Sequence, residues 1–281
     1  MEYPDGNEAC ALSPEEIARF REAVYSHFRK HRRSFPWRET TDPYCILVSE
    51  VMLQQTGVER VMVHYPSFIS SFPGFSPLAE APLADVLRAW KGLGYNRRAL
   101  NLHKTARIVT SEHGGMLPAE EKDLLSLPGI GKATAASIRA FAYNMPSVFI
   151  ETNIRRLFLH WFFPSGDRIP DSRILPLVRA TLDRENPRDW YYALMDFGAR
   201  LRSVVPDPNQ RSAHYHRQAP FRGSDREIRG RIISVLLRSG CVDQSDLPAE
   251  VEAEGDRVRA ICDRMAAEGL IIKEGGRFRL P

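Results

Sequence analysis

The chain has 281 residues, of which 43% are hydrophobic and 26% are charged, as is usual for a globular protein. No apolar run approaches the about 20 residues that a transmembrane helix needs, and the acidic, polar segment 1–10 does not resemble a secretory signal. The four cysteines are scattered, with no Cys-x-x-Cys pair, which argues against a disulfide framework or a zinc site. We therefore expect a cytoplasmic protein.

The positive charge is concentrated in the first three quarters of the chain. The net charge is only +4, and residues 222–281 contain 11 basic and 11 acidic residues. Residues 19–38 alone carry seven basic residues and one acid. A polyanion should therefore meet the first domain before the tail, although a solvated basic helix face would explain the same pattern.

The first 203 residues have the pattern of a helical domain. Ser13-Pro14-Glu15-Glu16 is typical of a helix start, with an N-cap, a proline in the first turn and two acids. Apolar residues recur at three- and four-residue intervals over 17–28 and 83–90, and 189–201 is a further amphipathic helix. No alternating strand pattern occurs before residue 268. We predict a mainly α domain over residues 1–203.

Residues 204–222 break this periodicity, and a small second domain follows them. The segment is polar and contains prolines, so we interpret it as a linker or an extended wrap. Over 223–281 we expect helices at 225–237, near Leu247 and at 256–268, and then a hairpin that turns on Gly275-Gly276. Three helices and a hairpin predict a winged-helix-like α+β domain.

The segment LPGIGKATA, residues 127–135, is the most informative motif. Gly129 and Gly131 give a tight turn with backbone N–H groups directed outward, and the helix that starts near Ala133 adds the positive end of its dipole. Together these features bind a phosphodiester without reading its sequence. This form of the turn is the helix-hairpin-helix signature.

With this signature the chain resembles the helix-hairpin-helix DNA glycosylases of the endonuclease III/MutY superfamily, over about residues 25–200. The resemblance implies two helical lobes around an active-site cleft, and SEVMLQQT favours the MutY-type adenine glycosylases within the superfamily. The matching segments are FPWR (35–38), SEVMLQQT (49–56), GLGY (92–95), NLH (101–103) and the hairpin itself.

Base excision breaks an N-glycosidic bond through a cation-like transition state, which calls for an acid and a carboxylate. Glu50 lies among apolar residues, where burial would raise its pKa and favour proton donation. By resemblance, Glu50 protonates the base and later helps to activate water. Glu151 stands where the superfamily has an aspartate and supplies the negative charge, and Asn153 orients water or sugar. The extra methylene of Glu151 leaves an altered base preference or a lost activity open.

The resemblance also assigns DNA contacts. Relatives that cleave the strand carry a lysine at the position of Ala133, so its absence predicts a monofunctional enzyme without a Schiff base to the sugar. Gln54 and Gln55 match the wedge that fills the duplex when a base is flipped out, and Tyr95 could stack nearby. The expected DNA-binding residues are Gln54, Gln55, Thr56, Tyr95, Gly129, Gly131, Lys132 and Thr134.

We expect two modules that are common in the family to be absent here. Residues 200–221 contain no cysteine, so we expect no iron–sulfur cluster and no other metal, with a monovalent cation at Leu127–Gly131 as the one open option. The Nudix-like domain that checks for oxidised guanine does not fit in the remaining 60 or so residues.

We expect a monomeric, nucleoid-associated DNA glycosylase that acts on double-stranded DNA with a mispaired or damaged base. Adenine opposite 8-oxoguanine or guanine is the first hypothesis. A uracil or thymine glycosylase for mismatches with guanine and a catalytically silent damage-binding protein are the alternatives.

Overall fold

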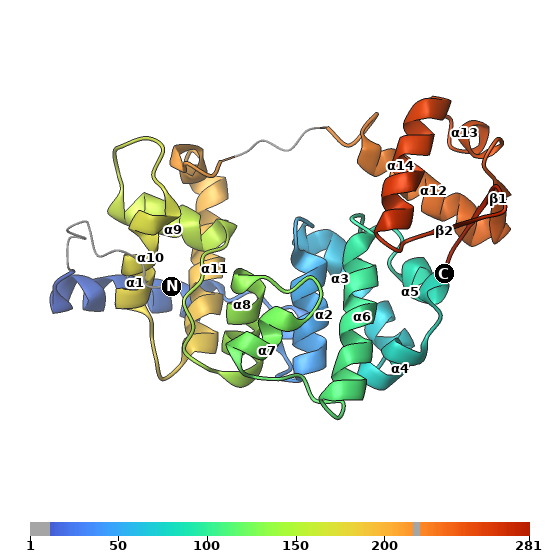
Figure 1. Ribbon diagram of the computed structural model, residues 1–281. Coiled ribbons are helices and arrows are strands. Elements are labelled where there is room, and N and C mark those ends of the chain that lie inside the picture. Colours follow the sequence, from blue (N-terminus) through green and yellow to red (C-terminus); the bar gives the residue numbers. More distant parts are fainter. Residues whose placement is uncertain (1–11, 216–219) are drawn as a thin grey trace. The chain divides into compact units, whose positions relative to one another are not determined.

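The computed structural model describes residues 12–215 and 220–281 and divides into two compact units (Figure 1). Unit 1 comprises residues 1–41 and 131–217, and unit 2 comprises residues 42–130 and 218–281. The segment 1–10 and residues 216–219 of the segment 204–222, both used in the sequence interpretation, lie outside the described residues. The predicted domain boundaries at 203 and 222 stay a prediction. Each unit is built from two separate stretches of the chain.

Unit 1 is helical, and it begins as predicted. Ser13 caps the first helix: its hydroxyl accepts from the backbone N–H of Glu16 at 3.2 Å, and the Glu16 carboxylate accepts from the Ser13 N–H at 2.8 Å. This reciprocal capping box satisfies two backbone donors at the helix start. The elements are α1 (Pro14–His31), the 3₁₀ helix η1 (Pro36–Arg38), α8 (Lys132–Tyr143), α9 (Thr152–Phe162), α10 (Asp171–Thr181), α11 (Pro187–Val204) and the 3₁₀ helix η2 (Pro208–Arg211).

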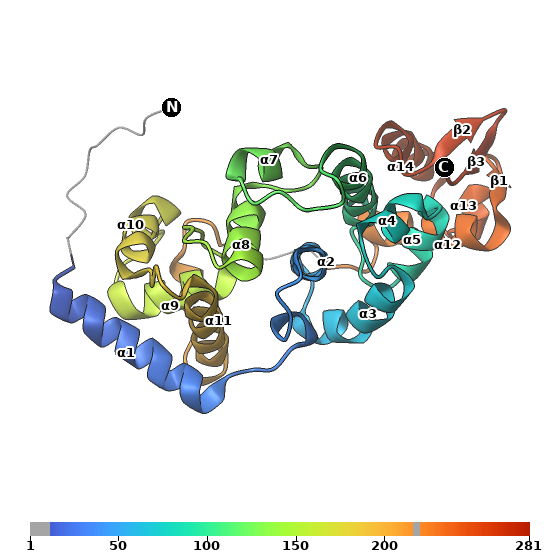
Figure 2. The ribbon, with the colours of Figure 1, turned by 90° about the horizontal axis from the view of Figure 1, so that it is seen from below.

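An aromatic cluster holds unit 1 together. Helix α1 runs along α10 and α11 (Figure 2), and its fully buried Phe20 meets the rings of Phe158 and Trp190 edge-on. Such edge-to-face pairs stabilise beyond the area that they bury. The buried Arg38 of η1 forms a two-pronged ion pair with the buried Asp196 of α11, at 3.0 Å for each bond. The FPWR segment, residues 35–38, is thus part of the packing of unit 1.

Unit 2 begins with six helices. Their core includes the buried rings of Phe68 and Trp90, whose centroids are 5.7 Å apart. The indole N–H of Trp90 donates to the carbonyl of Gly94 at 3.1 Å and so fixes the loop before α6. The helices are α2 (Pro43–Leu53), α3 (Val58–Ser71), α4 (Phe75–Glu80), α5 (Leu83–Ala89), α6 (Arg97–Glu112) and α7 (Glu121–Ser126).

The C-terminal part of unit 2 has the expected helices and hairpin, and one strand that the sequence interpretation missed. A three-stranded antiparallel sheet has the order β1-β3-β2, and Val242 faces Phe278 across β1 and β3. Strand β1 is only three residues long, too short to show alternation. The elements are α12 (Asp225–Ser239), β1 (Cys241–Asp243), α13 (Leu247–Glu250), α14 (Gly255–Ala267), β2 (Ile272–Glu274) and β3 (Arg277–Arg279).

Candidate active site and DNA interface

Glu50 lies in α2 of unit 2. The carboxylate of Asp42 caps this helix by accepting from the backbone N–H of Tyr44 at 2.7 Å, and Pro43 occupies its first turn. Ser49 and Val51 on either side of Glu50 are buried, whereas Glu50 itself is half-buried. The glutamate that we expect to act as the acid is therefore partly shielded from water and still within reach of a ligand.

The predicted wedge is the turn after α2. Gln55 has a φ of 54°, in the left-handed region that is costly for a side chain other than glycine, and its side chain is exposed. The buried guanidinium of Arg98 holds this turn: one nitrogen donates to the carbonyl of Gln54 at 2.7 Å, and the other donates to the hydroxyl of Thr56 at 2.9 Å. Gln54 and Thr56 are thus brought together by a residue that the sequence interpretation did not single out.

Arg98 also joins the wedge to the GLGY loop. It donates to the carbonyls of Val51 and Met52, in the last turn of α2, and to those of Leu93 and Gly94 at 3.1 and 3.0 Å. Burial lowers the pKa of Arg98 to about 10, which leaves it charged at neutral pH. A single planar cation therefore satisfies carbonyls at a helix end and in a loop, a task for which its forked geometry is suited.

Two arginines lie against the ring of Tyr95. Its φ of 49° is again left-handed, and the guanidinium carbons of Arg98 and Arg226 are 5.5 and 5.6 Å from its ring centroid. Arg226, from α12, also donates to the Tyr95 hydroxyl at 2.9 Å. The Tyr95 side chain, which we expect to stack on DNA, is therefore hydrogen-bonded to the C-terminal part of unit 2.

The hairpin has the geometry that its glycines predict. Gly129 has a φ of +80°, and a Cβ there would lie 2.8 Å from the side-chain nitrogen of Asn101, so both conformation and space demand glycine. Gly131 has an ordinary φ of −93° and open space around it, and it caps α8. Lys132 and Ala133 are exposed and Thr134 is half-buried. Neither the backbone conformation nor the packing of the chain thus requires glycine at position 131. A glycine there is expected if the phosphate of a ligand approaches the backbone, because a side chain would obstruct that approach.

Glu151 caps α9 in unit 1. One carboxylate oxygen accepts from the backbone N–H of Asn153 at 2.8 Å and from that of Ile154 at 2.9 Å. The other oxygen lies 3.3 Å from the side-chain amide nitrogen of Asn153. The Glu151 side chain bends back towards the first turn of α9. Its carboxylate therefore reaches the backbone N–H groups of Asn153 and Ile154 despite the extra methylene. Glutamate is an unusual N-cap, and a role beyond capping would account for it.

Two opposing effects act on the Glu151 carboxylate. Burial raises its pKa above the usual range, because a buried charge loses its hydration. The N–H groups of Asn153 and Ile154 and the charge of Arg156 act in the opposite direction, but burial prevails. The carboxylate is therefore held in a fixed orientation in a site where its negative charge is incompletely compensated.

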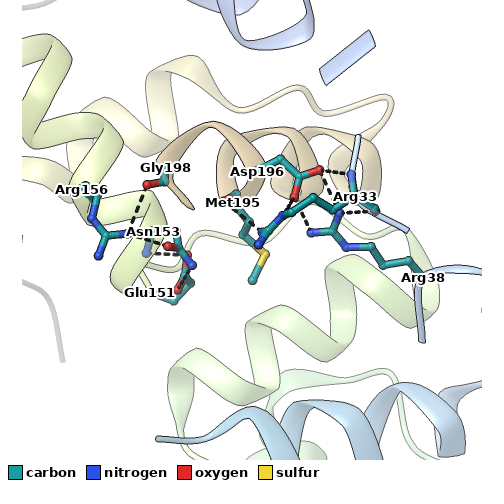
Figure 3. A network of polar contacts seen from close by, with 8 residues as sticks. All are labelled: Arg33, Arg38, Glu151, Asn153, Arg156, Met195, Asp196 and Gly198. Atoms are coloured by element: carbon teal, nitrogen blue, oxygen red, sulfur yellow. Dashed lines mark hydrogen bonds and ion pairs between the residues drawn. The ribbon is translucent and has the colours of Figure 1, made fainter. Parts of the chain in front are cut away.

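Arg156 links this cap to two other segments, and Figure 3 shows its contacts with Asn153 and Gly198. It is buried, and it donates to the side-chain oxygen of Asn153 at 2.6 Å and to the carbonyl of Gly198 in α11 at 3.1 Å. On its other side it donates to Asp207 at 2.8 Å. Burial alone would raise the pKa of Asp207, but the bonds from Arg156 and the Asn209 N–H hold it below its usual range. The side chains of Glu151, Asn153, Arg156 and Asp207 thus form one continuous chain of polar contacts.

The segment after α11 is docked on unit 1. Asp207 caps η2, the Asn209 amide donates to the Thr152 carbonyl at 3.0 Å, and the Arg211 guanidinium donates to the carbonyls of Leu159 and Phe163. A backbone bridge pairs Ile169 with Ser212. The contacts of Asn209 and Arg211 lie on α9 and on Phe163, the residue after it, and the interpretation of residues 204–222 as a linker or an extended wrap stays a prediction.

Comparisons with known proteins agree with this geometry. Residues 48–174 match the HhH-GPD superfamily of base excision DNA repair proteins. An adenine DNA glycosylase of Mycobacterium tuberculosis is 32% identical over 90% of this chain and 91% of its own length, and one of Mycolicibacterium smegmatis is 33% identical over 96% of both. A thymine/uracil-DNA glycosylase of Methanothermobacter thermautotrophicus is 30% identical over 64% of this chain and 83% of its own.

The chain belongs to the HhH-GPD superfamily of base excision DNA repair proteins.

Solved structures show the same fold. That of a thermostable thymine-DNA glycosylase is similar with a TM-score of 0.59 and 28% identity, covering 66% of this chain and 87% of the other. An endonuclease III in a DNA complex is similar with a TM-score of 0.55 and 17% identity, covering 66% and 86%. The predicted mainly α glycosylase fold and the prediction of a DNA glycosylase of base excision repair are confirmed. Among the described helices, none has the length and apolarity to cross a membrane.

The residues present do not fit the iron–sulfur cluster found in many members of this superfamily. Such a cluster needs four thiolates, and residues 200–221 contain no cysteine. The described cysteines, Cys45, Cys241 and Cys262, lie elsewhere in the chain and in unit 2. Within residues 12–215 and 220–281, no three His, Cys, Asp or Glu side chains group in a way that could hold a metal ion.

Proposed function

We propose that this glycosylase removes adenine opposite 8-oxoguanine or guanine. The observation that carries the proposal is the extent of similarity to proteins named adenine DNA glycosylase, which spans 90% to 96% of this chain and includes its C-terminal part. The similarity to the thymine/uracil-DNA glycosylase spans 64%. The SEVMLQQT segment that carries Glu50 and the wedge supports the same choice.

In the proposed reaction Glu50 protonates a ring nitrogen of the flipped adenine. The electrons of the glycosidic bond then pass to the base, which leaves, and positive charge develops on the sugar. The Glu151 carboxylate, held at the N-terminus of α9 by two backbone N–H groups, stabilises that charge. Water adds to the sugar carbon, and its proton passes to Glu50, which by then is ionised. Asn153, held by Arg156, orients the water or the sugar.

The proposal includes a monofunctional reaction. Ala133 occupies an exposed position in the first turn of α8, where relatives with a strand-cleaving activity carry the amine. Without that amine no Schiff base forms with the sugar carbon, so the product keeps an intact strand with an abasic site. Lys132 is adjacent, but one helical residue turns a side chain by about 100°.

A second candidate is a glycosylase for thymine or uracil opposite guanine. It is favoured by the solved structure with 28% identity and by the relative from Methanothermobacter thermautotrophicus, whose names both include thymine. The departure from aspartate at Glu151 favours it as well. A catalytically silent damage-binding protein is the third reading, in which the longer carboxylate of Glu151 leaves the site inactive.

A panel of duplexes tests the proposal. Labelled strands carry A, T, U or hypoxanthine opposite G, 8-oxoguanine, C or T, and each is incubated with the protein and analysed before and after hot alkali. We expect breaks at adenine opposite 8-oxoguanine or guanine, and only after alkali. Release of U or T but not A selects the second candidate. Salt-dependent binding without an abasic product, unchanged in Glu50→Gln, selects the third.

We also propose that the protein is a monomer that works without an iron–sulfur cluster. In place of a cluster, the polar contacts of Asp207, Asn209 and Arg211 fasten the segment after α11 to α9. Iron analysis of purified, active protein should find none, and the visible absorption of a cluster should be missing. An iron-containing brown preparation refutes this part, and a dimer in size-exclusion chromatography refutes the monomer.

A further inference from the structure

Helix α6 contacts both turns of unit 2 that we expect to meet DNA, which are the wedge turn (54–56) and the hairpin turn (127–130). Its residues Arg98, Asn101 and Thr105 are three and four positions apart, so they lie on one face of the helix. Arg98 donates to two residues of the wedge turn, at 2.7 and 2.9 Å. The other two residues of this face point to a second task for α6.

Asn101 and Thr105 hold the hairpin turn. The hydroxyl of the buried Thr105 donates to the carbonyl of Pro128 at 3.1 Å. The side chain of Asn101 occupies the space beside Gly129, where a Cβ would lie 2.8 Å from its amide nitrogen. Because glycine has more backbone freedom than any other residue, contacts from outside the turn help to fix its orientation. Helix α6 therefore supplies such contacts to the hairpin turn as well as to the wedge turn.

The two turns also share a small cavity. Its volume is about 50 Å³, and Gln54 of the wedge turn and Gly129 of the hairpin turn both line it, together with Arg98, Asn101 and Thr105. A space of this size holds a few ordered waters at most. Since the two turns are not tightly packed against each other at this cavity, their separation depends on the helix that holds them both.

A fixed separation matters because the two turns have to meet one duplex at the same time. The seven residues from Arg98 to Thr105 span about 10 Å of a stiff helix. Two linked contacts strengthen each other only when the geometry lets both form together. A hairpin turn that is displaced relative to the wedge turn should therefore lose its contribution to binding, even if its own residues are unchanged.

We propose that Asn101 and Thr105 are positioning residues for DNA binding, which together with Arg98 set the separation between the wedge turn and the hairpin turn. One face of α6 thereby couples the entry of Gln55 into the duplex to the binding of a phosphodiester at the hairpin. The inference rests on the proposed function, because it takes both turns as DNA contacts. The residues act through these turns and not on the reacting atoms.

Binding to an uncleavable duplex tests this role. The full chain is titrated into a labelled duplex that carries a tetrahydrofuran abasic analogue opposite guanine. Lys132→Ala, which removes a charge next to the hairpin turn, should weaken binding by the wild type about threefold or more. Thr105→Val removes the hydroxyl and keeps the shape of the side chain. It should weaken binding threefold or more, and Lys132→Ala should then add less than a twofold loss, because the hairpin no longer meets its phosphate.

Thr110→Val is the matched control. It makes the same change on the same helix, but the buried Thr110 hydroxyl has no hydrogen-bond partner among the described residues. Its affinity should equal that of the wild type, and the full effect of Lys132→Ala should remain.

Two further variants separate positioning from stability. Thr105→Ser loses a buried methyl group and Thr105→Val loses a buried hydrogen bond, so each should melt about 2–4 °C below the wild type. Thr105→Ser retains the donor to Pro128 and should bind the duplex like the wild type. Asn101→Ala, which empties the space beside Gly129, should weaken binding as Thr105→Val does.

Wild-type affinity in folded Thr105→Val or Asn101→Ala overturns the inference. An equal loss of affinity in Thr105→Ser and Thr105→Val also overturns it, because binding would then follow stability. The same holds if Lys132→Ala has no effect in the wild type, or its full effect in Thr105→Val. Failure of the wild type to release adenine refutes the proposed function instead, and these affinities still decide the role of α6.

Discussion

Arg156 and Asp207, 51 residues apart, form a partly buried ion pair behind the first turn of α9. The Arg156 side chain is 4% exposed, and its remaining donors hold Asn153 and Gly198. Asp207 therefore compensates a charge that would otherwise be nearly buried without a carboxylate. Through Arg156 it also sets where the Asn153 side chain lies next to the Glu151 carboxylate.

Asp207→Asn should lower both stability and activity. The amide oxygen can still accept hydrogen bonds, but the charge of Arg156 loses its partner, which costs about 3 kcal/mol of the free energy of unfolding for such a site. We expect base release in single turnover to slow tenfold or more, because Arg156 no longer holds Asn153 in place. Denaturant unfolding and the adenine-release assay measure the two effects.

Glu22→Gln is the matched control. It breaks the exposed pair between Glu22 and Arg29 in the same unit, and such pairs contribute about 0–1 kcal/mol. Its stability and rate should match the wild type. If Asp207→Asn behaves like this control, the ion pair has no part in positioning Asn153.

Gly198→Ala should be severely destabilising. A Cβ at Gly198 would lie 2.0 Å from the backbone carbonyl oxygen of Asn153, so α11 and α9 would have to move apart. A side chain that clashes with backbone atoms lowers the free energy of unfolding by about 3 kcal/mol or more, where no neighbouring side chain can move aside. The melting temperature should fall by several degrees. A Gly198→Ala protein that melts like the wild type would contradict the close approach of the two helices.

Local features of the fold were predictable from sequence. The helix start at Ser13 follows from a capping box that spans four residues, and the hairpin on Gly275-Gly276 follows from turn chemistry. The turn at Gly129 follows from its glycine, and its φ of +80° agrees. In each case the residues that decide the structure are neighbours in the chain, so a short window contains the whole signal.

Long-range partners were not predictable in this way. In the sequence, Arg98 is one of two basic residues at the start of a helix. Its hydrogen-bond acceptors lie up to 47 positions away, so a short window of sequence does not contain them. From the sequence, Asp207 is expected to be a loop residue, and its neighbours in the sequence do not predict an ion pair with Arg156. Periodicity reports which face of an element is buried, but it does not report which buried polar groups meet. The residues that position the wedge and the cap of α9 therefore emerge only from the structure.

Arg98→Lys should loosen the wedge. Lysine has three donors, whereas Arg98 donates to six acceptors, so at least three oxygens lose their partner. At about 1 kcal/mol each, the loss of stability is about 3 kcal/mol. Affinity for an abasic duplex should fall as well, because the Gln54-Gln55 turn is no longer fixed. Arg107→Lys, an exposed change on the same helix, should leave both quantities within error, and equal behaviour of the two variants would refute the role of Arg98.

Glu151→Gln should trade activity for stability. Because burial raises the pKa of Glu151 in the folded protein, its ionised form is less favourable there than in the unfolded chain. At neutral pH this carboxylate therefore lowers the free energy of unfolding, and the penalty disappears as the pH falls below its unfolded pKa of about 4.3. The glutamine oxygen can still cap α9, so the variant should melt higher than the wild type at pH 7, with the difference shrinking towards pH 4. Adenine release should drop about 100-fold or more, because no negative charge faces the cationic sugar.

The pH dependence of the wild-type rate should show the same raised pKa of Glu151. That rate should decline towards acid pH before an ordinary glutamate would be protonated, because the carboxylate must be ionised to stabilise the cation. Glu151→Asp retains the charge and should keep activity with a similar acid limb, since aspartate caps helices well. A Glu151→Gln protein that releases adenine at the wild-type rate would remove Glu151 from the reaction. An active Glu151→Gln protein with lower stability at pH 7 would show instead that the carboxylate serves the cap alone.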